Sequence, residues 1–450
     1  MLFKISNNQN YIIHLFQSIS IIGFLLYFFG LTNMYFWLGL TIVYLFTCTR
    51  VESGIFFLLV GSGIFGRMFA SQQLYISFII VSLLIGIYFL YKEIVYYINK
   101  NTYTYVFLFL IIFFYLFYYL LGPQTDYANE KIIKTISRGL IWTTTFIIFS
   151  QSQDVSSKRI SLPFLFLTIF YLSQSAELYN VRPSSIDDIT YFRTFCSLIG
   201  RNENQTLIVN YHTLAYLIIA YLVFWFSEKD FYKKDIWGSI FTLIITFWIL
   251  ILSGTRQTII SFAAIMLIRY LIKEKNIISV KNIVVLSIYI LFFVFFIRML
   301  GSAFFEDTFS SDAAWNDRIH RDTSTPYKVM SINPLTGVGF GAYGLYDSRH
   351  EYPHNFFLEL LCETGLIGFS IYLMIIGLFF YLNKFNLKLY FCTKCGAYLA
   401  PLFVLFFLRS MISGDFSDSM SFISILFCFV ATNINDIGII DNEEISESSI

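Results

Sequence analysis

Stretches of about 20 apolar residues recur along almost the whole chain, separated by short polar segments. A helix of that length crosses a bilayer, because each residue adds roughly 1.5 Å. Lipid offers no hydrogen bonds, so each crossing segment must satisfy its own backbone as a helix. Charged residues make up only 13% of the chain, against about 25% in soluble globular proteins. The sequence therefore predicts an all-α, polytopic transmembrane bundle, with residues 1–450 as a single integral membrane domain.

The predicted spans number about fourteen by this length criterion. They lie near residues 11–31, 34–49, 53–70, 74–91, 103–122, 133–150, 159–177, 207–227, 236–253, 256–273, 282–300, 361–383, 396–413 and 418–435.

The distribution of basic residues predicts which side of the membrane each connection faces. With the N-terminus inside, most lysines fall on cytoplasmic connections, as the positive-inside rule requires. Most arginines fall on the outer side instead: Arg67, Arg138, Arg182, Arg193, Arg201, Arg256, Arg298, Arg318, Arg321, Arg349 and Arg409. Three of them, Arg67, Arg138 and Arg298, can be read as interfacial arginines that reach toward the headgroups. The whole set suggests a binding site for phosphate or carboxylate groups, because a planar guanidinium can donate two parallel hydrogen bonds to such a group and an ammonium cannot.

Three polar segments stand apart from the short connections. Residues 178–206 and 301–354 are predicted outer loops, and the larger one mixes aromatic residues with carboxylates and arginines, as carbohydrate sites do. Long loops on a membrane scaffold are usually functional or disordered. Residues 436–450 are an acidic tail, predicted to be cytoplasmic.

The charge excludes nucleic-acid binding, and the motifs give little support to a metal site. The net charge of +1 leaves no basic domain for nucleic acid. The pair Asp187-Asp188 and the single Cys392-x-x-Cys395 are weak metal signals. We therefore expect neither a metal nor another cofactor.

The hairpin Ser253-Gly254-Thr255-Arg256 joins two predicted spans on the outer side. Thr255 suits the N-cap of the following helix, and the positive end of a helix attracts anions. Arg256 in the first turn would add a guanidinium, which predicts a phosphate site; the alternative is an interfacial arginine without a ligand.

A second polar corner, Pro353-His354-Asn355, ends the larger loop and opens a helix. A histidine beside a helix N-terminus tends to stay neutral and so can act as a base, although most such histidines are only hydrogen-bonded. Glu359 and Glu363 follow one turn apart. Carboxylates are costly inside a bilayer, so both should face a polar cavity or a basic partner such as Arg409.

Just upstream runs Asn333-Pro-Leu-Thr-Gly-Val-Gly-Phe-Gly341. Asn-Pro starts a turn, and the spaced glycines permit positive φ and close approach of backbones. No strand–helix context supports a nucleotide-binding loop.

The order N-P-L-x-G-x-G-x-G followed by H-N-x9-G-x-x-G, which here ends in Gly365-Leu-Ile-Gly368, resembles the O-antigen ligase and O-antigen polymerase superfamily. The Ser253–Arg256 hairpin is similar to that family's outer-loop arginine motif. The resemblance covers roughly residues 250–385. Phe369 departs from it, since a small or hydroxyl residue often follows the last glycine.

The resemblance implies a GT-C-like membrane glycosyltransferase in the bacterial inner membrane, with its site facing the periplasm and a glycan donor linked to undecaprenyl pyrophosphate. His354, Arg256 and Arg318 would be catalytic, and Arg256, Arg318, Arg321, Asn355, Glu359 and Arg409 would bind substrate. The leading hypothesis is a polymerase of the Wzx/Wzy-dependent pathway, which would polymerise O-antigen or capsule repeat units. A chain-length regulator protein would be a further partner. An O-antigen ligase acting on lipid A-core, and a transporter or flippase, remain alternatives.

Overall fold

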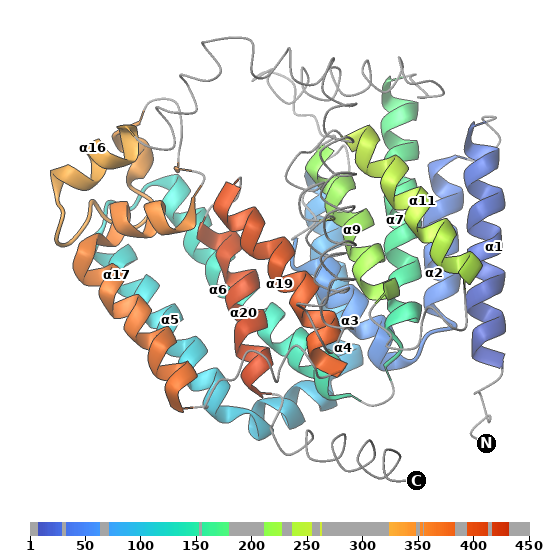
Figure 1. Cartoon of the computed structure of the whole chain (residues 1–450), viewed down its shortest axis with the longest axis horizontal. Helices are drawn as coiled ribbons and strands as arrows, with labels where there is room; N and C mark the ends of the chain where they lie inside the picture. The colour runs from blue at the N-terminus through green and yellow to red at the C-terminus, as the bar shows by residue number, and fades with distance from the viewer. Residues whose placement is uncertain are drawn as a thin grey trace, which may run out of the picture. The chain divides into compact units, whose positions relative to one another are not determined.

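The computed structural model describes residues 8–28, 33–63, 72–152, 155–179, 211–226, 236–253, 262, 324–347, 352–353, 355–382, 394–412 and 416–431. Over these ranges all regular structure is helical and no strand occurs, so the all-α prediction is confirmed there. The helices are α1 (Asn8–Phe28), α2 (Met34–Leu45), α3 (Arg50–Gly61), α4 (Gln72–Lys100), α5 (Thr102–Leu121), α6 (Asp126–Gln151), α7 (Ser157–Tyr179), α9 (Tyr211–Phe226), α11 (Ile236–Ser253), α16 (Thr325–Ile332), the 3₁₀ turn η2 (Tyr343–Leu345), α17 (Phe356–Leu382), α19 (Lys394–Ile412) and α20 (Phe416–Ala431) (Figure 1).

Four helices in the described part of the chain are long and apolar enough to cross a membrane: α4, α5, α6 and α17. Shorter apolar helices accompany them, among them segments of α1, α2, α9, α11, α19 and α20. This is consistent with a helical membrane protein. The predicted spans near 256–273 and 282–300 lie almost entirely outside the described residues, so the count of fourteen and the GT-C-like fold stay predictions.

The chain divides into two compact units. Unit 1 comprises Met1–Val95 and Gln151–Phe262, and unit 2 comprises Tyr96–Ser150 and Ala263–Ile450.

Unit 1 is built around α7 and α9. Both are apolar on every side, and their side chains are buried from Ile160 to Leu172 and from Leu214 to Phe226 with few breaks. A helix that is apolar all round must be surrounded by other helices rather than face water. Here α1, α2 and α3 pack against α7, and α11 packs against α9.

The hairpin α3–α4 in unit 1 is held together by glycines. A Cβ at Gly54 would lie 2.5 Å from Cγ of Leu90, and one at Gly86 would lie 2.8 Å from Leu58. Small residues of this kind let helix backbones approach closely where lipid supplies no hydrophobic drive. The opposite face of α4 is largely exposed and apolar.

Unit 1 also contains a polar joint around Glu52, at the start of α3. Its carboxylate accepts from the backbone N–H of Thr49 (2.9 Å) and from that of Ser156 (2.8 Å), and it pairs with Arg159 at 3.0 Å. Thr49 and Glu52 together form a capping box for α3. The joint therefore ties the α2–α3 turn to the beginning of α7.

Unit 2 combines the α5–α6 hairpin with α16, η2, α17, α19 and α20. In it α17 packs against α5, α16 and α20, and α19 packs against α20. Within the predicted outer loop 301–354, residues 324–347 form α16 and η2. Most of the predicted loop 178–206 and all of the acidic tail 436–450 lie outside the described residues, and the single integral membrane domain stays a prediction.

Candidate functional site

The helix α17 is broken at Gly365, which has φ 65° and ψ −174°. Glycine is essentially the only residue that adopts this conformation. The break frees carbonyl groups of the preceding turn, and backbone donors from residues 333–341, here called the glycine loop, reach them. Val338 N–H donates to the carbonyl of Cys362 at 2.9 Å, and Gly339 N–H donates to that of Glu363 at 3.0 Å.

The backbone N–H groups that follow the break donate hydrogen bonds to the same loop. Leu366 N–H donates to the carbonyl of Pro334 at 2.9 Å, and Ile367 N–H donates to that of Leu335 at 3.0 Å. Irregular backbone at membrane depth is tolerated only where protein satisfies it. The N-P-L-x-G-x-G segment therefore serves as the hydrogen-bonding partner of the broken G-x-x-G helix, which explains why the two motifs occur together.

The glycines of both motifs are required by this contact. A Cβ at Gly337 would lie 2.3 Å from the carbonyl carbon of Glu363, and a Cβ at Gly365 would lie 2.4 Å from that of Leu335. Both obstacles are backbone, which cannot swing aside. Gly337 also has a positive φ of 73°, so the predicted left-handed glycine conformation is confirmed here.

The remaining loop glycines face the α5–α6 hairpin. A Cβ at Gly339 would lie 2.8 Å from Cα of Gly122, and a Cβ at Gly341 would lie 2.6 Å from Cβ of Ala128. The φ angles of Gly339 and Gly341 are 103° and 71°. The glycine loop is thus enclosed between the broken helix and this hairpin.

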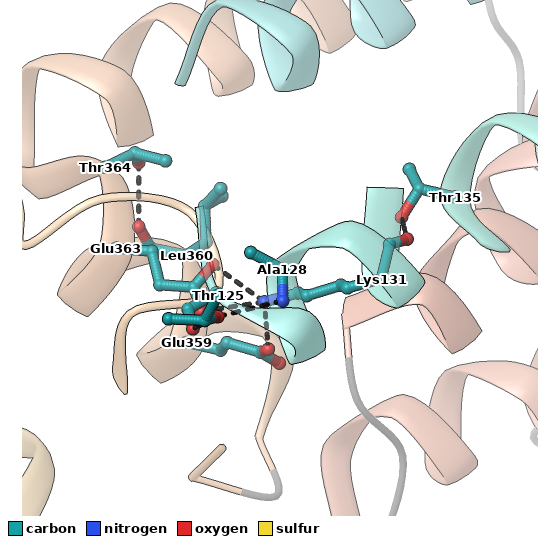
Figure 2. A network of polar contacts seen from close by, with 9 residues as sticks. Thr125, Ala128, Lys131, Thr135, Glu359, Leu360, Glu363 and Thr364 are labelled. Carbon is teal, nitrogen blue, oxygen red and sulfur yellow. Dashed lines mark hydrogen bonds and ion pairs between the residues drawn. The ribbon is translucent and has the colours of Figure 1, made fainter. Parts of the chain in front are cut away.

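A buried charge cluster lies beside the loop and joins α6 to the first part of α17 (Figure 2). The ammonium of Lys131 lies 2.5 Å from Oε1 of Glu359 and 2.7 Å from both carboxylate oxygens of Glu363. All three side chains are buried. We call these residues the Lys131 cluster. In a dry environment such contacts are strong, and removing one partner leaves a costly uncompensated charge.

Aromatic rings complete the surroundings of the ammonium. Lys131 Nζ lies 4.6 Å from the ring centroid of Phe340 and 5.6 Å from that of Tyr127. A cation over a ring face is attracted by the ring quadrupole. Tyr127 in turn stacks on Tyr352, with ring centroids 6.2 Å apart. Because Tyr352 directly precedes Pro353 and His354, the cluster borders the corner that the sequence singled out.

Asn355 is the N-cap of α17. Its Oδ1 accepts from the backbone N–H groups of Phe357 (3.1 Å) and Leu358 (3.2 Å), and its Nδ2 lies 3.5 Å from the carbonyl of Met411 in α19. Asparagine is among the preferred N-cap residues for this bond. The segment from Asn355 to the break is therefore held at its start by a cap, along its side by Lys131 and at its end by the glycine loop.

The structure describes three of the predicted site residues. Asn355 caps α17, Glu359 is buried against Lys131, and Arg409 lies half-buried in the last turn of α19. His354, Arg256, Arg318 and Arg321 lie outside the described residues. Lys131 was not among the predicted site residues; the signal that could have found it was the pair Glu359 and Glu363, for which a polar cavity or a basic partner such as Arg409 was expected and Lys131 is the partner found.

Comparison with known proteins bears on the same part of the chain. Residues 241–373 match the family model described as O-antigen ligase. The matched range contains the Ser253–Arg256 hairpin, the glycine loop, the His354-Asn355 corner and the break in α17. No curated protein matches the chain. The resemblance of this chain to the O-antigen ligase and polymerase superfamily is thus confirmed over residues 241–373, which are similar to the O-antigen ligase family.

Proposed function

We propose that the protein is a membrane glycosyltransferase of the polymerase kind, which extends an O-antigen or capsule polysaccharide. It would transfer the growing glycan from undecaprenyl pyrophosphate to the terminal sugar of an incoming lipid-linked repeat unit. The observation that carries the proposal is the O-antigen ligase match, which spans both the arginine hairpin and the histidine corner. The inner membrane and a periplasmic site belong to the same proposal.

The chemistry needs no activated nucleotide, because the donor already carries a pyrophosphate leaving group. The acceptor hydroxyl oxygen attacks the anomeric carbon, and the bond from that carbon to the pyrophosphate oxygen breaks. His354 takes the hydroxyl proton, a role typically worth about 10²–10⁴ in rate. The leaving oxygen keeps the electron pair, and Arg256 with Arg318 or Arg321 balances the charge that develops there.

The described geometry supports a fixed position for Asn355, the residue that follows His354. Asn355 caps a helical segment that is held at both ends and along its side. Groups held in place in this way lose little freedom when the reaction begins. Glu359 then contributes by anchoring the segment to Lys131, and Asn355 and Arg409 stay proposed substrate contacts.

Deleting the gene and analysing the surface glycan tests the assignment. If the protein is the polymerase, lipid A-core should carry a single repeat unit. Bare core, with finished polymer left on its carrier, would instead identify a ligase, the second candidate, which the description of the matched family favours. Normal polymer attached to core would contradict both, whereas bare core with no polymer on the carrier would point to a flippase instead.

Two variants test the residue roles by complementation of that deletion. His354→Ala should abolish chain extension while the protein stays inserted, with His14→Ala in the exposed face of α1 as the matched control.

Arg256→Lys should lose much of the activity, because an ammonium cannot donate two parallel hydrogen bonds to the pyrophosphate as a guanidinium does. Its control is Arg50→Lys, which alters an exposed pair with Glu93. Substantial polymer in the His354 variant, or full activity in the Arg256 variant, would refute the corresponding role.

A further inference from the structure

Beyond its break, α17 presents one continuous apolar stripe. Ile367, Ile371, Met374, Leu378 and Tyr381 are all exposed, and their spacing of four, three, four and three residues places them on one face of the helix. Because α17 is long and apolar enough to cross a membrane, an exposed apolar stripe of this kind is suited to contact lipid.

The stripe does not stop at the break but continues onto the glycine loop. The backbone bond from Ile367 to Leu335 holds Leu335 at the head of the stripe. Leu335 is 58% exposed, and Ile332, the last residue of α16, is 54% exposed. Leu366 beside them is half exposed as well. We call Ile332, Leu335, Leu366 and Ile367 the interfacial patch.

The length of α17 gives the depth of this patch. The stretch from Leu366 to Leu382 holds 17 residues, which rise about 25 Å at roughly 1.5 Å each. The hydrocarbon core of a bilayer is about 30 Å thick. With Leu382 at the opposite boundary, the break would fall within about 5 Å of the boundary between hydrocarbon and headgroups, on the side of the membrane where α17 begins.

The composition of α16 fits the same depth. Pro326 and Val329 are buried toward α17, and Val329 packs in a small core with Cys362. The outward positions carry Tyr327, which is 69% exposed, and the exposed Lys328. Tyrosine and lysine are typical of the headgroup layer, where an apolar body and a polar tip are both accommodated. Figure 1 shows α16 beside the N-terminal part of α17.

We propose that α16 and the glycine loop form an interfacial element, whose patch is inserted among the lipids of the leaflet at the N-terminal end of α17. The occupant is the bilayer itself, because the patch is continuous with the exposed apolar stripe of a helix that is long and apolar enough to cross a membrane. The element would fix the depth of the segment that follows His354 at the level of the headgroups. This inference rests on the chain crossing a membrane and not on the proposed glycosyl transfer.

Photocrosslinking of the full chain tests the proposal. p-Benzoylphenylalanine is placed singly at Leu335 or Ile332, and the protein is reconstituted into vesicles of phosphatidylethanolamine and phosphatidylglycerol and irradiated. Mass spectrometry of the peptides should find phospholipid adducts at both positions. Two positions are used so that a folding failure at one leaves the test intact.

Control positions calibrate the result. Met374 in the apolar stripe should give the same adducts, and Glu130, in the exposed pair with Lys134, should give few. The proposal is overturned if Leu335 and Ile332 crosslink to residues 263–323 or to a second copy of the chain. It is equally overturned if they yield no lipid adduct while Met374 does.

Discussion

At the scale of single residues, the Lys131 cluster is a fully buried group of charges in the described part of unit 2. Two carboxylates share one ammonium, so Lys131 is the member whose loss leaves most charge unbalanced. Removing one partner of a buried pair costs about 3–5 kcal/mol. Replacing all members by neutral groups is often tolerated, because no buried charge is then left without a partner.

We therefore expect Lys131→Met to lower the free energy of unfolding by about 3–5 kcal/mol, and Glu359→Gln to lower it less because Glu363 still balances the ammonium. Detergent-solubilised protein, unfolded with denaturant and followed by tryptophan fluorescence, gives both values. Lys134→Met is the matched control, since Lys134 forms an exposed pair with Glu130 in the same helix. Exposed i,i+4 pairs contribute about 0.3–0.5 kcal/mol.

Combining Lys131→Met with Glu359→Gln and Glu363→Gln makes this explanation testable by rescue. The triple variant should recover much of the stability that the single variant lost. If it is no more stable than Lys131→Met alone, uncompensated charge is not the cause of the loss.

At the scale of the element, the break in α17 depends on two glycines that meet backbone from opposite sides. Gly365→Ala would force a residue with a Cβ into a conformation that costs of order 1–3 kcal/mol, and it would also place that Cβ against Leu335. Gly337→Ala should be damaging for the same steric reason. Gly377 in the same helix has no atom within 4 Å of a built Cβ, so Gly377→Ala should be neutral or slightly stabilising.

The comparison is measured by melting each variant in detergent and by the amount inserted in membranes. A Gly365→Ala protein as stable as Gly377→Ala would show that α17 closes into a regular helix without cost. That outcome would remove the explanation offered for the pairing of the two motifs.

The same element shows what the sequence could and could not foresee. Positive φ and close backbone approach at Gly337, Gly339 and Gly341 follow from the properties of glycine and were predicted. The cost of buried charge predicted that Glu359 and Glu363 face a polar cavity or a basic partner such as Arg409. The identity of that partner did not, because Lys131 lies 228 positions before Glu359 and its local sequence resembles any helix start. Long-range pairing of this kind is decided by packing, which local patterns do not encode.

At the scale of the whole molecule, apolar length predicted the helices but not where they end. The predicted span 74–91 became α4, which continues to Lys100, because a helix can extend into water once its backbone is satisfied internally. The predicted span 53–70 became α3, which ends at Gly61. The predicted phosphate site depends on Arg256, Arg318 and Arg321, which lie outside the described residues. The part of the candidate site that the structure describes is the side formed by α17.

The predicted orientation of the chain in the membrane can be checked on unit 1. Arg50 pairs with Glu93 at 2.6 Å, and Glu52 pairs with Arg159. The α2–α3 turn, the last part of α4 and the start of α7 therefore lie on one side of this unit. Lys92 lies in the last part of α4 and Lys158 at the start of α7, so the positive-inside rule predicts that this side is cytoplasmic.

Single cysteines at Phe46, Lys92 and Ser156 test this orientation, introduced into a chain whose native cysteines are replaced by alanine. In spheroplasts, a membrane-impermeant maleimide should leave all three unlabelled, and permeabilisation should make them reactive. Phe46 is highly exposed, so lack of reaction there cannot come from burial. Labelling of all three cysteines without permeabilisation would invert the predicted orientation. Labelling of only one would contradict the Glu52 joint. Residues joined through ion pairs at about 3 Å cannot face opposite sides of a hydrocarbon core about 30 Å thick.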